Sequence, residues 1–491
     1  MPKVTGTPPS SSVLSNTGTS KQNEVTAPKT PITNATVGLE DPFKGAAKLT
    51  DPVLAESFRQ LQGDAATIER VLPKQDDKVL IIGTARSKPV PGENGFADYA
   101  WAERLGEELR KVGLSVGTGG GPGAMEAPLR GHARQDAVMD MEARKSNPSK
   151  TIGWEAGEPT RQGANIILPN EQGANPFIPQ QHLASYEKFL FRMEHLIRRT
   201  SDVITSPGGF GTVAENFTFM AMKSHGAIGT PIAFGSHDDF FVKHNAAFEP
   251  FLNPKEAEDH QNVFTDPAAL AKFVAEAKNT VPEEDISAMK KRMESDLLRG
   301  LQKLDGQPHA IAFFGGAGER TKASAGVVTE IAEAMARQGN TLRVGGSPIL
   351  DQAVLGAAKR ANPDAEVQAF AMNDAPVEST KSMEYTKVQD VLVLRELMNT
   401  NLKGIVVAPE GAKQLGLLFT ALTDMQTGEM PKLPVVVIDP DGKFADLKKM
   451  LHELMLTNGR RYINPEDLEL FTTVKTTQEA LAVLNNASAA A

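Results

Sequence analysis

The sequence contains no cysteine, which excludes disulfides, thiolate nucleophiles, iron–sulfur clusters and cysteine-ligated zinc. Long apolar runs are missing as well. No stretch approaches the roughly 18 consecutive apolar residues that a membrane-spanning helix needs, and the N-terminus lacks the apolar core of a secretory signal. We therefore expect a soluble protein, with the cytoplasm as the default compartment.

An excess of positive charge is also missing. The 491 residues include 52 Lys and Arg against 61 Asp and Glu, a net charge of −9. Such a field repels nucleic acids and anionic membranes, so we expect neither as a partner, and a phosphate-bearing ligand must be captured locally. The length allows two or three domains, and 40% hydrophobic with 23% charged residues is typical of a globular protein.

The first 48 residues are rich in Ser, Thr and Pro and poor in large apolar side chains. Such a segment buries too little surface to offset its ordering entropy, so residues 1–48 are predicted to be a disordered tail. A targeting signal is the alternative, but no arginine precedes Arg59, unlike typical transit peptides.

A parallel-sheet pattern begins at Val79. The apolar run 79–82 stops at Gly83, a helix pattern follows through Trp101 and Leu105, and a second short strand is expected at 114–116. This is the opening of a βαβ sheet, and we predict a first Rossmann-like domain over residues 49–284.

The same pattern restarts in the second half of the chain. An amphipathic connecting helix is expected at 285–305, a second Rossmann-like domain at 306–484 and a short tail at 485–491. One constant offset aligns Gly113 with Gly339 and continues through these pairs: Gly119-Gly120 with Gly345-Gly346, Pro122 with Pro348, Ala127 with Ala353, Arg134 with Arg360. The fold class is therefore α/β, with two doubly wound parallel-sheet domains from an internal duplication.

Two glycine-rich loops lie between a predicted strand and a predicted helix. The first covers residues 117–127, and the second covers 206–215, where the glycine amides and the Thr212 hydroxyl form a natural phosphate cradle. A tight turn without a ligand is the alternative for the first loop. The second is neither a Walker loop nor the dinucleotide fingerprint, which disfavours NTP hydrolysis.

Two charged residues can reach the second loop. Glu215 lies one turn into the helix that follows it, where it could orient a water or a sugar hydroxyl. Arg192 precedes Pro207 by fifteen residues, on a helix expected at 185–199. The alternatives are a carboxylate that only complements the helix dipole and a solvated basic face that includes Arg198 and Arg199.

These motifs together resemble the LOG family of phosphoribohydrolases, long labelled lysine decarboxylases. The resemblance rests on Gly119 to Ala127, Asn165 to Gln172, Asn175-Pro176, Arg192 and the loop Pro207 to Glu215. It covers about residues 75–280, with a degenerate copy over 306–484.

The resemblance implies cleavage of the N-glycosidic bond of a nucleoside 5′-monophosphate, AMP or a cytokinin riboside 5′-monophosphate, without a metal or organic cofactor. Arg192 and Glu215 match the catalytic positions. The expected substrate- and phosphate-binding residues are Gly83, Thr84, Gly119, Gly120, Gly121, Gly123, Met125, Glu126, Pro207, Gly208, Gly209, Gly211 and Thr212. Because the family is generally dimeric, we expect a pseudo-dimer within the chain or a homo-oligomer.

Departures from the family pattern limit what the resemblance implies. Met193 stands where a Lys is common, and the base-binding side, around Met220 and His225, is less recognisable. In the second copy, Leu394 and Leu417 replace the catalytic pair and Glu410 replaces Gly208, so we interpret this copy as a pseudo-enzyme.

The sequence leaves one other function class open and disfavours a second. A non-catalytic nucleotide- or cofactor-binding carrier or sensor is the alternative to an enzyme. Amino-acid decarboxylation is disfavoured, because no lysine stands in a context that fits pyridoxal phosphate. His132, His182 and His195 have no metal-ligand spacing, and we expect surface or supporting roles for them.

Overall fold

The computed structural model describes residues 49–146, 158–168, 173–277, 285–380 and 383–488, and every structural statement below concerns these residues. The predicted tail at 1–48 and the family-like residues 169–172 lie outside them. Lys48–Ala491 forms one compact unit. In the described ranges, no helix is both long and apolar enough to cross a membrane.

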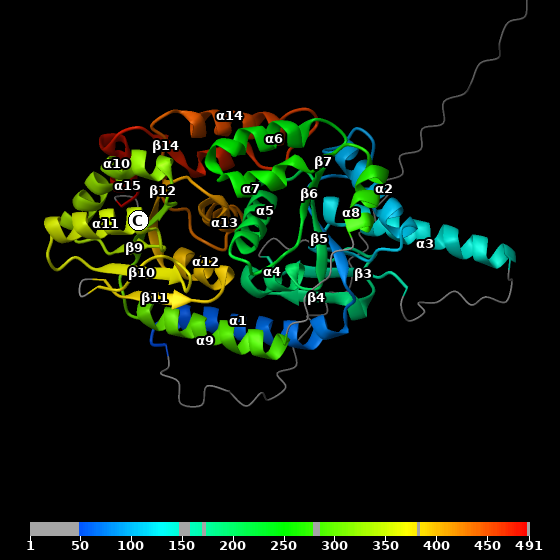
Figure 1. The fold of residues 1–491 in the computed structure, drawn as a ribbon, viewed down its shortest axis with the longest axis horizontal. Coiled ribbons are helices and arrows are strands. Elements are labelled where there is room, and N and C mark those ends of the chain that lie inside the picture. Colours follow the sequence, from blue (N-terminus) through cyan, green and yellow to red (C-terminus); the bar gives the residue numbers. More distant parts are fainter. Residues whose placement is uncertain (1–48, 147–157, 169–172, 278–284, 381–382, 489–491) are drawn as a thin grey trace, which may run out of the picture. The chain divides into compact units, whose positions relative to one another are not determined.

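Two seven-stranded parallel sheets form the framework (Figure 1). Their strand orders are β4-β3-β2-β1-β5-β6-β7 and β11-β10-β9-β8-β12-β13-β14, the same arrangement twice. The first sheet consists of β1 Lys78–Ile82, β2 Val116–Thr118, β3 Arg161–Ile166, β4 Leu183–Tyr186, β5 Thr200–Thr205, β6 Ile232–Gly235 and β7 Val263–Phe264. The second consists of β8 Ala310–Gly315, β9 Leu342–Val344, β10 Val367–Met372, β11 Tyr385–Val388, β12 Leu402–Ala408, β13 Val435–Ile438 and β14 Thr472–Val474.

Helices cover both faces of each sheet, as apolar strands buried on both sides require. In the first half they are α1 Pro52–Val71, α2 Phe96–Lys111, α3 Ala127–Ser146, α4 Phe189–Ile197, α5 Phe210–Ser224, α6 Phe240–Phe248, α7 Pro254–Glu258 and α8 Pro267–Ala277. In the second they are α9 Ile286–Leu304, α10 Glu319–Arg337, α11 Pro348–Ala361, α12 Val391–Asn399, α13 Ala412–Thr427, α14 Lys443–Leu456 and α15 Thr477–Ser488. The predicted doubly wound α/β class is confirmed.

Two local predictions from the sequence are wrong. The helix expected at 185–199 is shorter, because residues 183–186 pair with β3 as strand β4 and α4 begins only at Phe189. The strand expected at 114–116 begins at Val116 and continues through Gly117 and Thr118, which pair with Leu80 and Ile81 of β1. Strand pairing overrides the apolar pattern in both places.

The two halves share one hydrophobic core. The largest buried cluster contains Leu80 and Phe217 from the first half together with Leu417 and Phe419 from the second. Two smaller clusters fill the outer faces of the two sheets. The sheets therefore pack through a common inner layer of helices.

The helices α5 and α13 form the centre of this layer (Figure 1). They run antiparallel, because Gly211 lies near Thr423 while Gly416 lies near Thr218. At Gly416 a side chain would be 3.4 Å from the Thr218 nitrogen, so the small residue allows the close approach. Phe210 and Phe419 add an edge-to-face ring contact at 5.6 Å.

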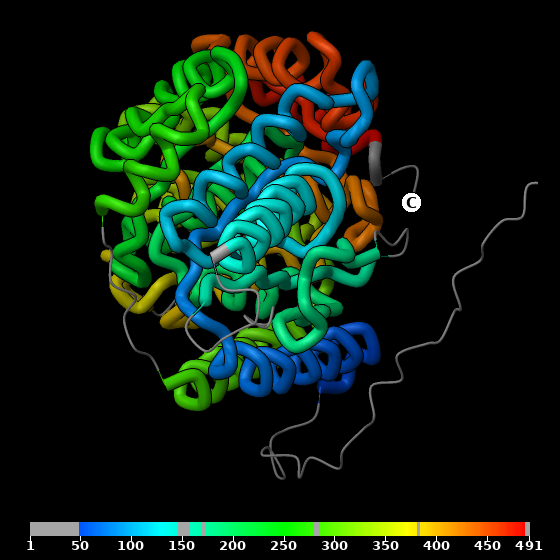
Figure 2. Tube along the Cα trace, turned by 90° about the vertical axis from the view of Figure 1, so that its right-hand side faces the viewer, coloured from blue at the N-terminus to red at the C-terminus, as the bar shows by residue number. Residues whose placement is uncertain are grey.

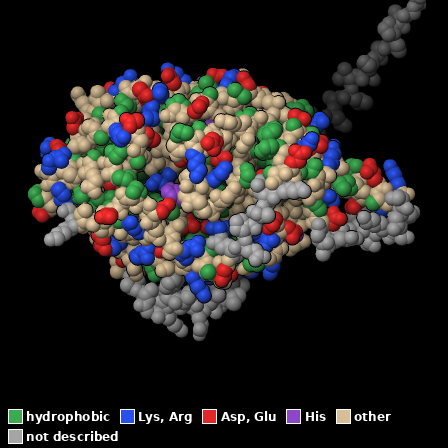
Figure 3. Space-filling model, in the orientation of Figure 1, with side chains coloured by type: hydrophobic (Ala, Val, Ile, Leu, Met, Phe, Trp, Pro, Cys, Tyr) green, Lys and Arg blue, Asp and Glu red, His purple; other side chains and the backbone are tan. Residues whose placement is uncertain are grey.

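A second pair of helices, α1 and α9, lies along one side of both sheets (Figure 2). The predicted connecting helix is α9, and Met289, Met293 and Leu297 form its buried stripe. Ser287 and Lys290 of α9 bind the carboxylate of Glu69 on α1. On the face seen in Figure 3, Lys and Arg side chains are interspersed with Asp and Glu rather than gathered into a single-sign patch.

Candidate active site in the first half

The two glycine-rich loops meet at the carboxyl ends of β1, β2 and β5, where ligands bind in doubly wound sheets. The Thr84 amide donates to the Pro207 carbonyl at 3.2 Å, and the Ala124 amide donates to the Thr84 carbonyl at 2.7 Å. A side chain at Gly83 would meet Ala124 and Ser206. The structure therefore brings the predicted loop residues together at one crevice.

The candidate catalytic pair is a buried ion pair. Nη1 of Arg192 donates to Oε1 of Glu215 at 2.9 Å, and the two side chains are 5% and 15% exposed. Nε of Arg192 donates to the carbonyl of Ala164 at 2.9 Å, while the guanidinium lies 5.7 Å from the Phe189 ring centre. Three neighbours thus fix the guanidinium in one orientation, and the alternative of a solvated basic face does not hold for Arg192.

Two glycines are required by what packs against them. A side chain at Gly119 would overlap the second guanidinium nitrogen of Arg192 and the sulfur of Met125. A side chain at Gly208 would overlap the hydroxyl of Thr212. These glycines therefore let the cation and the hydroxyl approach the loop backbone, as a phosphate cradle requires.

Neighbouring residues support the first loop. The Asn175 amide donates to the carbonyls of Gly120 and Gly121 at 3.2 and 3.1 Å, and Gly120 and Gly123 adopt positive φ angles of 74° and 70°. Glu126 accepts a hydrogen bond from the Tyr99 hydroxyl at 2.7 Å, so its carboxylate is turned toward α2.

The second half of the chain contributes directly to this site. Its segment Gly459–Asn464, which we call the latch, lies against the second loop: a side chain at Gly209 would be 2.6 Å from the Tyr462 carbonyl and 3.0 Å from Ile463. Arg86, beyond Thr84, donates to the Asn464 amide oxygen at 3.0 Å. The site is therefore completed by residues about 250 positions further along the chain.

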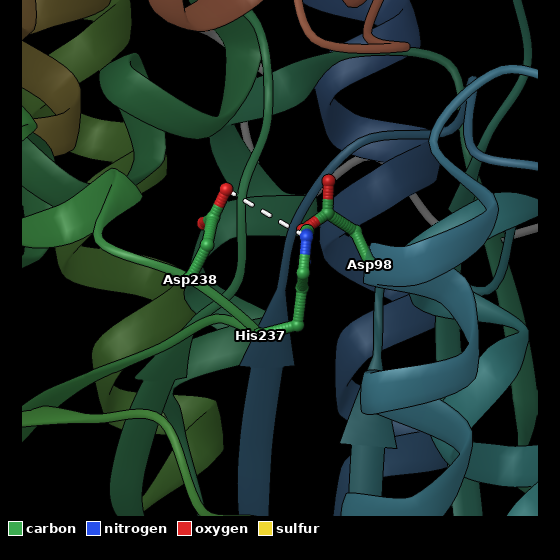
Figure 4. Close-up of side chains that lie close together, drawn as sticks. All are labelled: Asp98, His237 and Asp238. Carbon is green, nitrogen blue, oxygen red and sulfur yellow. Dashed lines mark hydrogen bonds and ion pairs between the residues drawn. The ribbon is translucent and has the colours of Figure 1, made fainter.

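The latch is held by a buried cluster of charges around Asp98 (Figure 4). Arg460 donates to both carboxylate oxygens of Asp98 at 2.7 and 2.9 Å, and Tyr462 donates to the same carboxylate. His237 and Asp238 complete the cluster, the first 2.8 Å from Asp98 and the second 3.0 Å from Arg460.

Asp98, His237 and Asp238 lie close enough together to resemble a metal site. However, the Arg460 guanidinium already bridges the two carboxylates. Although burial opposes ionisation, hydrogen bonds from Arg460, His237 and Tyr462 lower the pKa of Asp98 to about 2, and the Asp98 hydrogen bond raises the pKa of His237. Because the guanidinium occupies the space between the two carboxylates, this cluster fits a structural lock better than a metal centre.

A cavity of about 370 Å³ is lined by residues of both halves. Phe189, which contacts Arg192, forms part of its wall together with Arg395, Asp424 and Thr420 from the second half. Arg395 also donates to the Thr218 hydroxyl at 3.3 Å, one turn along α5 from Glu215. The buried hydroxyl of Thr420 has no hydrogen-bond partner, and burial raises the pKa of Asp424 to about 7.

The second half lacks this chemistry at the equivalent positions. Leu394 and Leu417, at the places of Arg192 and Glu215 on α12 and α13, are 1% and 4% exposed and belong to the shared core. His225, expected on the base side of the first site, instead lines a cavity of the second half and binds Asp374 at 3.1 Å. His132 and His195 are buried rather than on the surface.

Sequence reasoning identified both loops and the ionic pair, but it missed the latch, Arg86 and Ala164. One signal was available for the latch region. The capping-box pattern Asn253-Pro254-Lys255-Glu256 recurs as Asn464-Pro465-Glu466-Asp467, and each copy lies near the loop of the opposite half.

Comparison with known proteins agrees with the predicted resemblance. The family model described as "Possible lysine decarboxylase" matches residues 328–484. A pyrimidine/purine nucleotide 5′-monophosphate nucleosidase of Escherichia coli K12 is 32% identical over 120 residues, which are 24% of this chain and 22% of that protein. The chain thus matches about a fifth of the length of this curated relative.

Solved structures match the chain only at low similarity. A molybdenum cofactor binding protein from Rippkaea orientalis covers 41% of this chain and 98% of its own, with 14% identity and a TM-score of 0.28. The molybdenum cofactor carrier protein of Chlamydomonas reinhardtii covers 37% and 99%, with 16% identity and a TM-score of 0.28. The family model and the nucleosidase relative each match part of the chain, so the chain is similar to the LOG family over part of its length.

Proposed function

We propose that this chain hydrolyses the N-glycosidic bond of a nucleoside 5′-monophosphate, with AMP or a cytokinin riboside 5′-monophosphate as substrate. The observation that carries the proposal is the buried Arg192–Glu215 ion pair beside two glycine-rich loops at the carboxyl edge of the first sheet. The nucleosidase relative supports the reaction class.

The site contains groups that could bind the negative charge of the phosphate and stabilise the positive charge that develops on the ribose. Backbone amides at the start of α5 and the Thr212 hydroxyl would hold the 5′-phosphate. As the bond between C1′ and the base nitrogen breaks, positive charge develops on the ribose, and the Glu215 carboxylate would stabilise it and orient the attacking water. Arg192 holds Glu215 in position through the hydrogen bond from its Nη1. Water adds its oxygen to C1′ and the base leaves with a proton, giving ribose 5-phosphate and free base.

The cavity between the halves is the space that the base would occupy. It adjoins Phe189 and contains polar groups of the second half, including the unpartnered Thr420 hydroxyl. A carboxyl with a pKa of about 7, such as Asp424, can donate a hydrogen bond to a base nitrogen near neutral pH.

We also propose that the second half stands in for the partner subunit of a dimeric relative, so that the chain is a pseudo-dimer formed by internal duplication. The repeated strand order, the shared core and the latch support this arrangement. One active site per chain follows.

The test is to incubate the full-length protein with AMP, GMP, CMP, UMP and N6-isopentenyl AMP, and to measure free base and ribose 5-phosphate by chromatography. We expect base release that falls at least about a hundredfold in Glu215→Gln and in Arg192→Ala, the scale of a positioned charged group. Leu417→Met, at the equivalent position of the second half, is the matched control and should keep full activity.

Near-wild-type rates in either first-half variant would overturn the assignment. Tight binding of a nucleotide without any release of base would instead support a carrier or sensor.

A further inference from the structure

A second cavity, of about 550 Å³, lies at the carboxyl edge of the second sheet. Its walls come from the segments 315–318, 346–348, 374–376 and 410–414, with Ser224, His225 and residues 250–253 of the first half opposite them. This is the point between β8 and β12 where the strand order reverses, the usual place for a ligand in a doubly wound sheet. The volume is in the range of small-molecule sites.

Two helix N-termini at this cavity could bind an anion, but their backbone amides already donate hydrogen bonds to carboxylates of the protein itself. Glu410 accepts hydrogen bonds from the backbone amides of Gly318, Arg320 and Thr321, at 2.8, 3.2 and 3.2 Å, and so caps α10. Glu256 accepts from the amide of Ala412 at 3.1 Å and so caps α13. In the first half, Gly208 stands at the position of Glu410, and its loop carries no such carboxylate.

A half-buried cation, Lys413, remains in the second cavity although the arginine is lost. Nζ of Lys413 donates to the carbonyl of Gly345 at 3.3 Å. Gly345 is the counterpart of Gly119, beside which Arg192 lies, so a lysine from α13 reaches the place that an arginine from α4 occupies in the first half. Burial lowers the pKa of Lys413, opposed by the nearby Asp351 and Asp374.

The charges lining the cavity exclude a second phosphate. Glu256, Glu410 and Asp374 face Lys413 and His225, and His225 is already bound to Asp374 at 3.1 Å. Three carboxylates against one lysine and one paired histidine give no surplus of positive charge for a phosphate dianion. To bind at the N-termini of α10 and α13, a phosphate would also have to displace Glu410 and Glu256. Each displacement would break the hydrogen bonds that the carboxylate accepts.

We propose that this second cavity binds a neutral nucleoside or free nucleobase, the ligand class of the first site without its phosphate. The choice of class rests on the proposed function, whereas the exclusion of phosphate rests on the carboxylates of this cavity, Glu410, Glu256 and Asp374. Glu410 acts here as an internal substitute for the phosphate. A neutral base has donors and acceptors that Lys413, His225 and Ser347 can pair with, and the cavity is therefore a site for the reaction's product or for the dephosphorylated substrate.

The experiment measures adenosine, adenine and AMP binding to the full-length protein by calorimetry, and localises each by hydrogen–deuterium exchange. Every measurement of AMP binding uses the Glu215→Gln background, so that AMP is not converted to adenine. We expect adenosine or adenine to protect the amides at 315–321 and 410–416, and AMP to protect those at 117–125 and 207–213. Pro376→Trp fills the exposed rim of the second cavity, and it should weaken the nucleoside site at least about tenfold while AMP cleavage stays unchanged.

Glu410→Gly is the decisive variant, because it frees the backbone amides at the N-terminus of α10 that Glu410 binds. We expect AMP to protect 315–321 in this variant, with about tenfold or greater gain in affinity at that site, the scale of charge-assisted hydrogen bonds to backbone amides. Glu410→Gln removes the charge but keeps the side chain, and it serves if the glycine variant does not fold. Glu466→Gln, on the surface, is the control and should change neither pattern.

The outcomes separate the two proposals. Protection at 315–321 and 410–416 by AMP in Glu215→Gln, which should leave AMP uncleaved, or no protection there by adenosine or adenine, would overturn the inference. Absence of base release from every nucleotide, with adenosine still protecting the second cavity, would overturn the proposed hydrolysis and leave the second binding site standing.

Discussion

The two halves of the chain have the same strand order and different chemistry at the same edge. In the first half, the Arg192–Glu215 pair lies beside loops whose glycines let Arg192 and Thr212 approach the backbone. In the second, Leu394 and Leu417 extend the hydrophobic core, and Glu410 closes the anion seat. The difference teaches that strand order and packing persist when the polar residues of a site are replaced, because the core is built from other positions.

The largest expected effect comes from removing the second half altogether. Residues 45–285 alone would expose the inner faces of α5 and α6, where Phe210 and Phe248 lose their ring contacts with Phe419 at 5.6 and 5.8 Å. A large uncovered apolar face favours aggregation. We expect an insoluble or inactive fragment, measured by sedimentation and by base release, and a soluble fragment with full activity would show that the second half is dispensable.

The next largest effect is expected at the buried charge cluster around Asp98, which joins the two halves. Arg460→Ala leaves Asp98 buried without its guanidinium, and we expect the free energy of unfolding to fall by about 3–5 kcal/mol, as for other broken buried pairs. Urea-induced unfolding measures this. Arg337→Ala removes an exposed pair with Glu333 and should cost less than about 0.5 kcal/mol. Equal, small losses in the two variants would contradict the lock.

Gly119 and its counterpart Gly345 allow the same substitution to be compared at the carboxyl edges of the two sheets. In Gly119→Ala, the added methyl group overlaps the Arg192 guanidinium and the Met125 sulfur, so we expect kcat for base release to fall about a hundredfold, the scale of an ångström-sized displacement of a catalytic group. In Gly345→Ala, the methyl group meets only the flexible end of Met398, at 3.0 Å, and activity should hardly change. The reverse order of effects would place the chemistry in the second half.

The smallest predicted effect concerns pH and the helix that joins the halves. Burial raises the pKa of Glu294 on α9 to about 7, so this carboxyl stays protonated in the folded protein while the unfolded chain ionises above about pH 4.5. Its contribution to stability is therefore complete below that pH and is lost as the pH rises through 7. The free energy of unfolding, measured with urea, should be lower at pH 8 than at pH 5. Glu294→Gln should reduce this difference by about 2 kcal/mol. An unchanged difference in the variant would contradict the assignment.

Much of the fold could be predicted from the sequence, because parallel strands buried on both faces are continuous apolar runs and the turns after them contain glycine. The runs at 79–82 and 310–315 were found in this way. Strand β4 was missed, since Leu183–Tyr186 adjoins an apolar helix and only its pairing with β3 distinguishes it. Residues whose state depends on a distant neighbour have no local signature.

The same limit applies to the site. Arg192 and Glu215 could be predicted because their spacing from Pro207 is a local motif. Tyr462 and Asn464 could not, because they reach the loop only through the packing of the two halves. That Lys413 points to the counterpart of Gly119 was equally hidden, since the sequence aligns Lys413 with Gly211 and not with Arg192.

The latch has a consequence for how the protein is made. Gly459–Asn464 lies within the last 35 residues of the 491-residue sequence, yet it lies against a loop formed by residues 206–212. At about 5–20 residues per second, synthesis of the intervening stretch takes on the order of ten seconds to a minute, during which the first sheet can form while its catalytic edge stays uncovered. Emergence of the latch from the ribosome therefore marks the moment at which the candidate site becomes complete.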